Sequence, residues 1–284
     1  MSLATSSRVD TTQKVIMNPR LKHVIDLNTD VGQSRDVAFF RQTDYALLKY
    51  VSSVNVPCFV HDGAPKQVLE ALHHAKLNHC VIGAHVGFPD PTQQGYSVQQ
   101  LDDDELKTWL LIQLGALQAV LKPLHLDFEH IRPHGALYNA FLDNPTVAMT
   151  VAKTLFDYNH WAILVGPAGP LLKRVEEEIG IRTAPEVYLG RHYTEQGVPV
   201  MGEATAKSLH SNLVLEQLKQ VLNDGTLTAT NGQTLPVEAK TFHLSPQLDG
   251  VVSTAEHVYQ LIGQPVALPV AAVTSTGWSH GLDQ

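Results

Sequence analysis

Histidines, carboxylates and amides recur where the short apolar segments of this chain end. The chain has 284 residues, of which 15 are histidine. One β-like segment runs into Asp26 and Asp30, and the next two lead to His61 and His85. The carboxyl ends of parallel strands meet at one face of a barrel, and that face carries the chemistry in such proteins. The same face is expected to receive Asn28, Asn55, Arg132, His134, Tyr138, Asn139, Glu186, Arg191, Tyr193 and His243.

Two kinds of chemistry could use these side chains. In the first, Asp26 or Asp30 joins His61 and His85 as ligands of a divalent metal ion, with an open position for water. The metal set that we predict is Asp26, His61 and His85. In the second, an aspartate deprotonates water while a histidine or arginine stabilises the developing oxyanion, and no metal takes part. In either case we expect Asp26, Asp30, His61 and His134 to be the catalytic residues.

Most other histidines and both cysteines are expected to have no chemical role. Most of the remaining histidines, His130 among them, are predicted to lie at the surface. Cys58 and Cys80 border apolar strands, where buried and unreactive thiols are the rule. Two cysteines are too few for a disulfide framework, and no stretch near the first residue has the pattern of an export signal. We therefore expect a cytoplasmic protein.

The elements that must position these residues alternate along the chain. Short apolar or β-branched segments alternate with segments of helical period, which predicts a parallel sheet with outer helices. A closed or nearly closed (β/α) barrel is favoured over an open doubly wound sheet. The predicted strands are 22–28, 51–58, 80–85, 128–133, 161–166, 184–189 and 240–245. Predicted helices cover 64–78 and 103–122, follow Pro145, precede Asp224, and begin at Ser253 with Glu256 in capping-box spacing.

The chain is expected to form one barrel domain over residues 21–284, preceded by a flexible polar tail over 1–20. Asp-Gly and Asn-Gly turn signals within 224–240 predict a small hairpin insertion. The net charge of −8 argues against nucleic-acid and anionic-membrane partners. No apolar run approaches the roughly 20 residues of a membrane helix. A small-molecule substrate is therefore expected, and a homo-oligomer remains one alternative for the assembly.

Six segments of the sequence resemble the LamB/YcsF family, whose members are the first of three kinds of subunit (A, B and C) in the bacterial ATP-dependent 5-oxoprolinase. They run in order from about residue 22 to about residue 202, and the most specific are RPHGALYN and the SSVNVPC segment with the histidine that follows it. The resembling segments are 26–33, 52–65, 81–90, 113–121, 132–139 and 186–200.

This resemblance implies a (β/α)7 barrel of the glycoside hydrolase/deacetylase type. It implies hydrolysis of a cyclic amide C–N bond, opening 5-oxoproline to glutamate with ATP consumed in a complex with subunits B and C. By resemblance, nucleotide binding would then be a property of that complex. The residues it implicates in substrate binding are Asn28, Asn55, Arg132, Tyr138, Asn139, Glu186, Arg191 and Tyr193.

The sequence also departs from the family pattern at several charged positions. Gln33 stands where the family has a glutamate, and residues 92–96 lack an expected pair of arginines. The segment after the sixth strand reads Leu189-Gly190-Arg191 without the family aspartate. These departures keep two alternatives open: a divalent-metal deacetylase or amide hydrolase, and a non-catalytic binding subunit that kept the barrel.

Overall fold

Seven parallel strands close into a barrel in the computed structural model, which describes residues 25–33, 37–200 and 210–268. The strand order around the barrel follows the chain, so each strand pairs with the one before and after it, and the last closes on the first. The strands are β1 (Asp26–Asp30), β2 (Ser53–Pro57), β3 (Val81–Val86), β4 (His130–Pro133), β5 (Ile163–Pro167), β6 (Thr183–Tyr188) and β9 (Thr241–His243). The predicted (β/α)7-type fold is confirmed.

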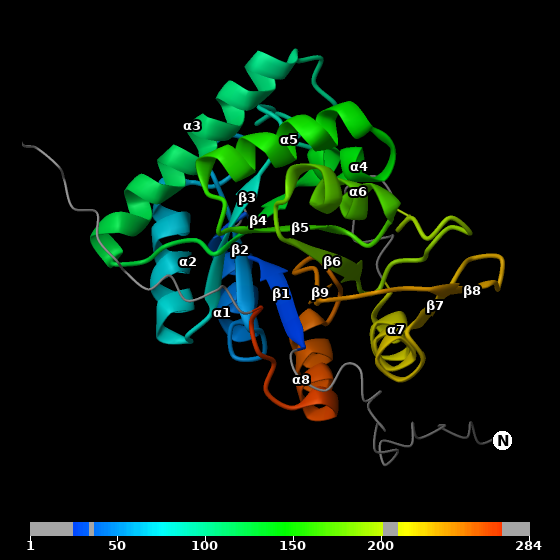
Figure 1. Cartoon of the computed structure of the whole chain (residues 1–284). Coiled ribbons are helices and arrows are strands. Elements are labelled where there is room, and N and C mark those ends of the chain that lie inside the picture. Colours follow the sequence, from blue (N-terminus) through cyan, green and yellow to red (C-terminus); the bar gives the residue numbers. More distant parts are fainter. Residues whose placement is uncertain (1–24, 34–36, 201–209, 269–284) are drawn as a thin grey trace, which may run out of the picture.

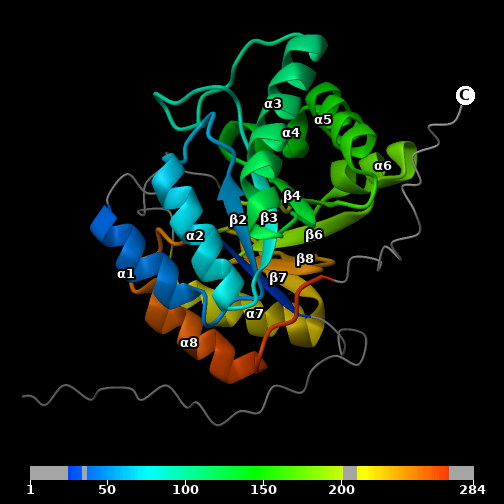
Figure 2. The same ribbon diagram turned by 90° about the vertical axis from the view of Figure 1, so that its left-hand side faces the viewer.

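Each barrel strand is followed by at least one helix, and these helices form the outer layer (Figure 1). Neighbouring helices pack on one another around the barrel: α1 against α2 and α8, and α5 against α3 and α6 (Figure 2). The helices are α1 (Val37–Leu47), α2 (Pro65–Leu77), α3 (Asp103–Leu121), α4 (Gly135–Asp143), α5 (Pro145–Tyr158), α6 (Pro170–Ile179), α7 (Ser211–Asp224) and α8 (Val251–Ile262). No helix within the described ranges has the length and apolar character needed to cross a membrane.

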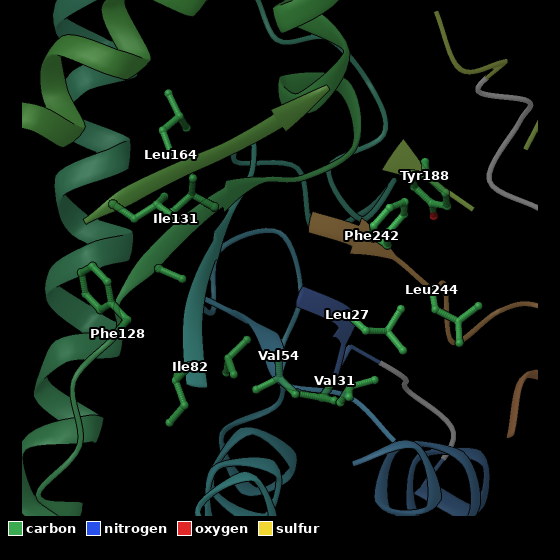
Figure 3. Close-up of a cluster of buried hydrophobic side chains, with 14 of the residues drawn as sticks. Leu27, Val31, Val54, Ile82, Phe128, Ile131, Leu164, Tyr188, Phe242 and Leu244 are labelled. Carbon is green, nitrogen blue, oxygen red and sulfur yellow. The ribbon is translucent and has the colours of Figure 1, made fainter. Parts of the chain in front are cut away.

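Strand alternation divides the side chains of the barrel into two sets. Leu27, Val54, Ile82, Ile131 and Phe242 point outward and pack beneath the helices, where they form the main apolar core (Figure 3). The residues between them point into the barrel, because successive side chains of a strand face opposite sides. The core of this protein is therefore a shell between strands and helices.

The interior of the barrel is largely polar. Asp26, Asn28 and Asp30 enter from β1, and each is less than a tenth exposed. His130 enters from β4, so its predicted surface position is wrong: it lies two residues before Arg132 on the same strand and shares its inward face. An apolar patch of Ile163, Val165 and Ala184, covered by Leu268, forms a separate cluster. Apart from that patch, the lumen is built to hold polar groups.

The predicted elements agree with the structure in type and differ at some ends. All seven predicted strands are present, but β1 spans 26–30 where 22–28 was expected, so Asp30 belongs to the strand. The capping box at Asp102 and Glu105 is present. The predicted start at Ser253 is wrong, because α8 begins at Val251 after Gly250 in a left-handed conformation. β7 (Thr226–Thr228) and β8 (Thr234–Pro236) pair antiparallel inside the segment whose turn signals predict a hairpin.

A pair of glycine substitutions tests the packing of the lumen. A Cβ on Gly83 would lie 2.0 Å from His130 Nε2, because this imidazole crosses over Gly83 to reach Asn55. We expect Gly83→Ala to lower the free energy of unfolding by about 3 kcal/mol, since the imidazole cannot yield without losing its buried hydrogen bond. Chemical denaturation measures the change.

Gly115 is the matched control, because a Cβ there meets nothing within 4 Å on the exposed side of α3. Gly115→Ala should stabilise the protein by about 0.5–1 kcal/mol through helix propensity. A Gly83→Ala variant as stable as the wild type would contradict the lumen geometry.

Candidate active site

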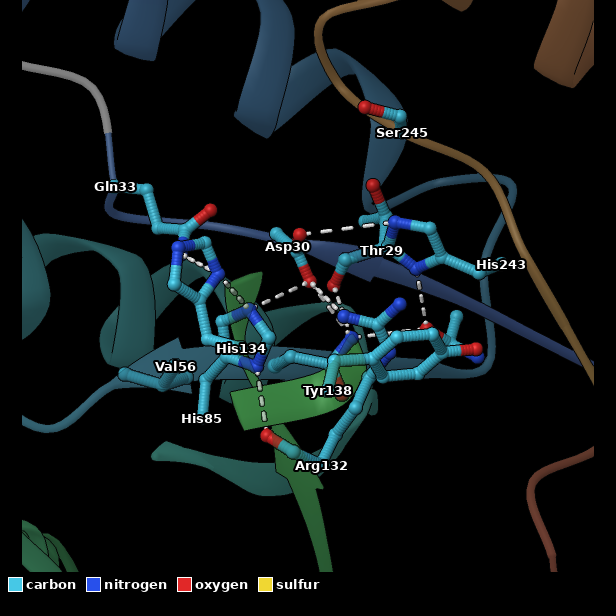
Figure 4. A network of polar contacts seen from close by, with 12 residues as sticks. Thr29, Asp30, Gln33, Val56, His85, Arg132, His134, Tyr138, His243 and Ser245 are labelled. Atoms are coloured by element: carbon cyan, nitrogen blue, oxygen red, sulfur yellow. Dashed lines mark hydrogen bonds and ion pairs between the residues drawn. The ribbon is translucent and has the colours of Figure 1, made fainter. Parts of the chain in front are cut away.

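Asp30 occupies the centre of a polar network inside the barrel, near the carboxyl ends of the strands (Figure 4). Its Oδ1 accepts a hydrogen bond from Asn55 Nδ2 at 2.9 Å and lies 3.6 Å from Arg132 Nη1. His85 Nε2 is 3.5 Å from Oδ1, and His243 Nε2 is 3.6 Å from Oδ2. Burial alone would raise the pKa of Asp30, but these two imidazoles and the guanidinium hold it well below its usual value. Asp30 is therefore a carboxylate.

Arg132 is clamped by a second buried carboxylate. Its Nε and Nη2 donate to Glu186 Oε1 and Oε2 at 2.8 and 2.7 Å, a two-point contact between planar groups. The Tyr138 hydroxyl donates to Glu186 Oε2 at 2.9 Å, and the guanidinium lies 4.8 Å from the centre of the same tyrosine ring. Burial opposes ionisation of Glu186, but Arg132 lowers its pKa below the usual value. In this structure Arg132 therefore forms ion pairs with two protein carboxylates, Glu186 and Asp30.

The two carboxylates set the direction of the hydrogen bonds around them. A carboxylate only accepts, so the Asn28 amide directs Nδ2 to Glu186 and leaves its Oδ1 as an acceptor for His243 Nδ1 at 2.8 Å. By the same logic Asn55 donates to Asp30, and its Oδ1 accepts from His130 Nε2 at 2.9 Å. His243 therefore carries its hydrogen on Nδ1, and His130 carries one on Nε2.

Three histidines stand together beside Asp30, as their strand-end positions predict. The rings of His61 and His134 are stacked with centroids 4.5 Å apart, and His85 meets His134 edge-on at 4.7 Å. His85 Nδ1 donates to the Arg132 carbonyl and His134 Nε2 to the Gln94 carbonyl, both at 2.8 Å. Burial, then the neighbouring imidazoles of His61 and His85, hold the pKa of His134 well below its usual value. His134 is therefore a neutral base with its lone pair on Nδ1.

Glycines allow the loops to close on these rings. A Cβ on Gly87 would lie 2.8 Å from His61 Nδ1, and one on Gly95 would lie 3.0 Å from His134 Cδ2. Gly95 also adopts a φ of +76°, which favours glycine. The loop between β3 and α3 thus lies directly on the histidines, with Tyr96 edge-on to His134.

The predicted metal set is not brought together. Asp26 lies four residues before Asp30 on β1, about 13 Å along the strand, and its oxygens accept from Ser52, Ser53 and Thr241 at 2.5–2.9 Å. Within the described part of the chain, no group of three or more His, Cys, Asp or Glu side chains is arranged to hold a metal ion. The predicted set of Asp26, His61 and His85 is therefore not assembled into a metal centre in this structure.

The other predicted site residues take different positions. Tyr193 uses its hydroxyl to bind the backbone of Tyr188, accepting from the amide at 2.8 Å. The Arg191 guanidinium stacks over Tyr188 at 4.5 Å. Asn139 lies on α4 with a buried Oδ1 that has no partner. Cys58 is buried, and burial raises its pKa, so its thiol is unreactive as predicted.

Sequence reasoning missed several residues that complete the network. Thr241 bridges Asp26 and Asn28. Gln113 of α3 holds Gly87 at two points: its Oε1 accepts from the Gly87 amide and its Nε2 donates to the Gly87 carbonyl, each at 2.9 Å. Gln33, at the position where the family has an acid, lies 3.3 Å from His134 Nδ1 and donates to it. The alternation of inward positions could have identified Thr241, two residues before His243; nothing in the local sequence marks Gln113.

Asp44 of α1 anchors the end of β1 and should give a pH-dependent stability. It accepts from the Gly32 amide at 2.7 Å, and burial raises its pKa to about 7. An acid with a raised pKa binds its proton more tightly when folded, so its contribution to stability is lost as pH rises from about 4 to 7. Asp44→Asn keeps an acceptor oxygen without a charge. We therefore expect the free energy of unfolding of the variant, relative to that of the wild type, to be about 2 kcal/mol higher at pH 8 than at pH 5.

Denaturant unfolding of both proteins at the two pH values measures this difference. A constant difference between the proteins at pH 5 and pH 8 would contradict the assignment.

Residues 25–273 match the LamB/YcsF family. The A-type subunit of 5-oxoprolinase from Bacillus cereus is 32% identical over 238 residues, covering 83% of this chain and 94% of that protein. The corresponding subunit of Thermococcus onnurineus is 29% identical over 239 residues, 84% of this chain and 93% of that protein. The solved lactam utilization protein of Thermus thermophilus superposes with a TM-score of 0.76 at 28% identity, covering 86% and 99% of the two chains. The chain is therefore a member of the LamB/YcsF family.

Proposed function

We propose that this protein is a hydrolase like the A-type subunit of 5-oxoprolinase, opening the ring of 5-oxoproline to give glutamate. The observation that carries the proposal is Asp30, a carboxylate held ionised in a closed polar lumen beside neutral histidines. The names of the relatives from Bacillus cereus and Thermus thermophilus support the substrate class.

The chemistry sets what the residues must do. Resonance makes an unstrained lactam a weak electrophile, so a water must be positioned and activated and the carbonyl oxygen must be stabilised as it gains charge. The water oxygen attacks the carbonyl carbon, the ring C–N bond breaks, and the nitrogen leaves with a proton.

The arrangement suggests a role for each group. Asp30 is a poor base, because its pKa lies well below the usual value, but it can orient a water through an accepted hydrogen bond. The His134 Nδ1 lone pair is a second acceptor in the cluster to which a proton of that water could pass. Arg132, 3.6 Å from Asp30 through Nη1, is the nearest positive charge for a developing oxyanion. Returning the proton to the leaving nitrogen completes the cycle.

ATP and partner subunits belong to this proposal as well. The relatives are named as subunits, and the resemblance associates them with subunits B and C and with ATP hydrolysis. The sequence contains no phosphate-binding loop of the GxxxxGK[ST] type. We therefore propose that ATP is bound in the complex, in the cytoplasm, and that this chain supplies the hydrolytic site.

A neutralised aspartate tests the proposed role. Asp30→Asn should lower 5-oxoproline turnover at least about 100-fold in a reconstituted complex, because the amide cannot replace the carboxylate in orienting water. Asp127→Asn is the matched control, since Asp127 is exposed and binds only Gln118 in the described structure. Glutamate release measured with partner subunits and ATP gives the readout. Full activity of the Asp30 variant would contradict the mechanism and favour a non-catalytic subunit.

A further inference from the structure

Too many hydrogen-bond acceptors face one another around Asp30. His85 donates through Nδ1 to a backbone carbonyl, and its Nε2 faces Asp30 Oδ1 at 3.5 Å. His243 donates through Nδ1 to Asn28, and its Nε2 faces Asp30 Oδ2 at 3.6 Å. Asp30 Oδ2 thus faces a bare nitrogen of His243, and Oδ1 faces the second ring nitrogen of His85.

On the far side of His85, one ring is satisfied and another is not. His134 donates through Nε2 to Gln94, and its Nδ1 accepts from Gln33 and lies 3.0 Å from His85 Nε2. His243 Nε2 and both ring nitrogens of His61 are buried without a hydrogen-bond partner. Burial lowers the pKa of His243 to about 4, which keeps this ring neutral near pH 7.

Few donors offset this surplus. Arg132 directs its hydrogens mainly to Glu186, and Asn55 gives Asp30 one hydrogen bond. A buried acceptor that has lost its water and gained no donor destabilises the folded protein. A ligand that supplies a donor would remove this penalty. The Asp30 side chain keeps 10% of its surface exposed, whereas the side chains of His85 and His243 are fully buried. A ligand carrying a hydrogen-bond donor would therefore approach the cluster from the exposed side of Asp30.

We propose that the Asp30, His85 and His243 cluster is a subsite for the N–H group of the substrate, so that the enzyme selects a cyclic amide by its ring nitrogen. The inference rests on the proposed function and extends it to the orientation of the ring. A single N–H placed between Asp30 and a flanking imidazole supplies the missing hydrogen. The ring oxygen of a lactone cannot, because it has lone pairs in place of the hydrogen. The negative charge of Asp30 also disfavours a substrate carboxylate placed directly against it.

Three compounds with the same ring size test the subsite in the intact chain. They are 5-oxoproline, its N-methyl derivative, and the lactone with oxygen in place of the ring N–H. Calorimetric binding to the wild-type protein should be about 10- to 100-fold weaker for the last two, because buried acceptors then lose their donor. The lactone differs by one small group and adds no bulk, so it separates hydrogen bonding from steric exclusion.

A variant extends the comparison. Asp30→Asn brings a donor into the cluster and should reduce the preference for the N–H compound to less than about threefold, whereas Asp127→Asn should keep it. Circular dichroism checks that both variants fold, and the wild-type comparison stands without them.

Each outcome separates the two proposals. Equal binding of all three compounds would overturn the N–H subsite and leave the lactam hydrolase standing. An unchanged preference in Asp30→Asn would also overturn it. If no compound binds, with or without partner subunits, both the subsite and the proposed function are wrong.

Discussion

Two buried carboxylates, Asp30 and Glu186, govern the arrangement of the lumen. Both accept hydrogen bonds only, and both share Arg132. Each amide beside them must turn its nitrogen toward the carboxylate, and each histidine beside such an amide must then donate to its oxygen. The tautomers of His243 and His130 therefore follow from these two charges, although an asparagine stands between each ring and its carboxylate.

This polar interior changes where the stability of the barrel comes from. A barrel of this type is commonly filled by layers of branched apolar residues. In this protein the main apolar core lies instead between the strands and the helices, where Leu27, Ile131 and Phe242 pack. Removing one member of a buried ion pair leaves an uncompensated charge, so Arg132 and Glu186 must be kept together. The polar lumen thus serves as the site, and the apolar layer between strands and helices stabilises the barrel around it.

Much of the fold could be predicted from local sequence, and part of the site could not. The seven strands follow from short apolar segments between helical ones, and the histidines at their ends converge as expected. The prediction of Asp26 as a metal ligand fails because sequence gives the end of a strand to within a few residues, whereas four residues place Asp26 at the other end of the lumen. The clamp of Arg132 by Glu186 joins residues 54 apart, and only the closed barrel brings them together. The surface prediction for His130 fails because it considers one residue type alone, without the inward face that His130 shares with Arg132.

The direction of the hydrogen bonds in the lumen is the claim on which the proposed chemistry depends. Two-bond nitrogen–proton correlation spectra of the histidine rings in uniformly ¹⁵N-labelled protein, assigned with single His→Gln variants, report which nitrogen of each ring carries hydrogen. Near pH 7 we expect His85 and His243 to carry hydrogen on Nδ1, His243 to have a bare Nε2, and His130 to carry hydrogen on Nε2. Hydrogen on Nε2 of His243 would contradict the account, because the unpaired acceptor that faces Asp30 would then not exist.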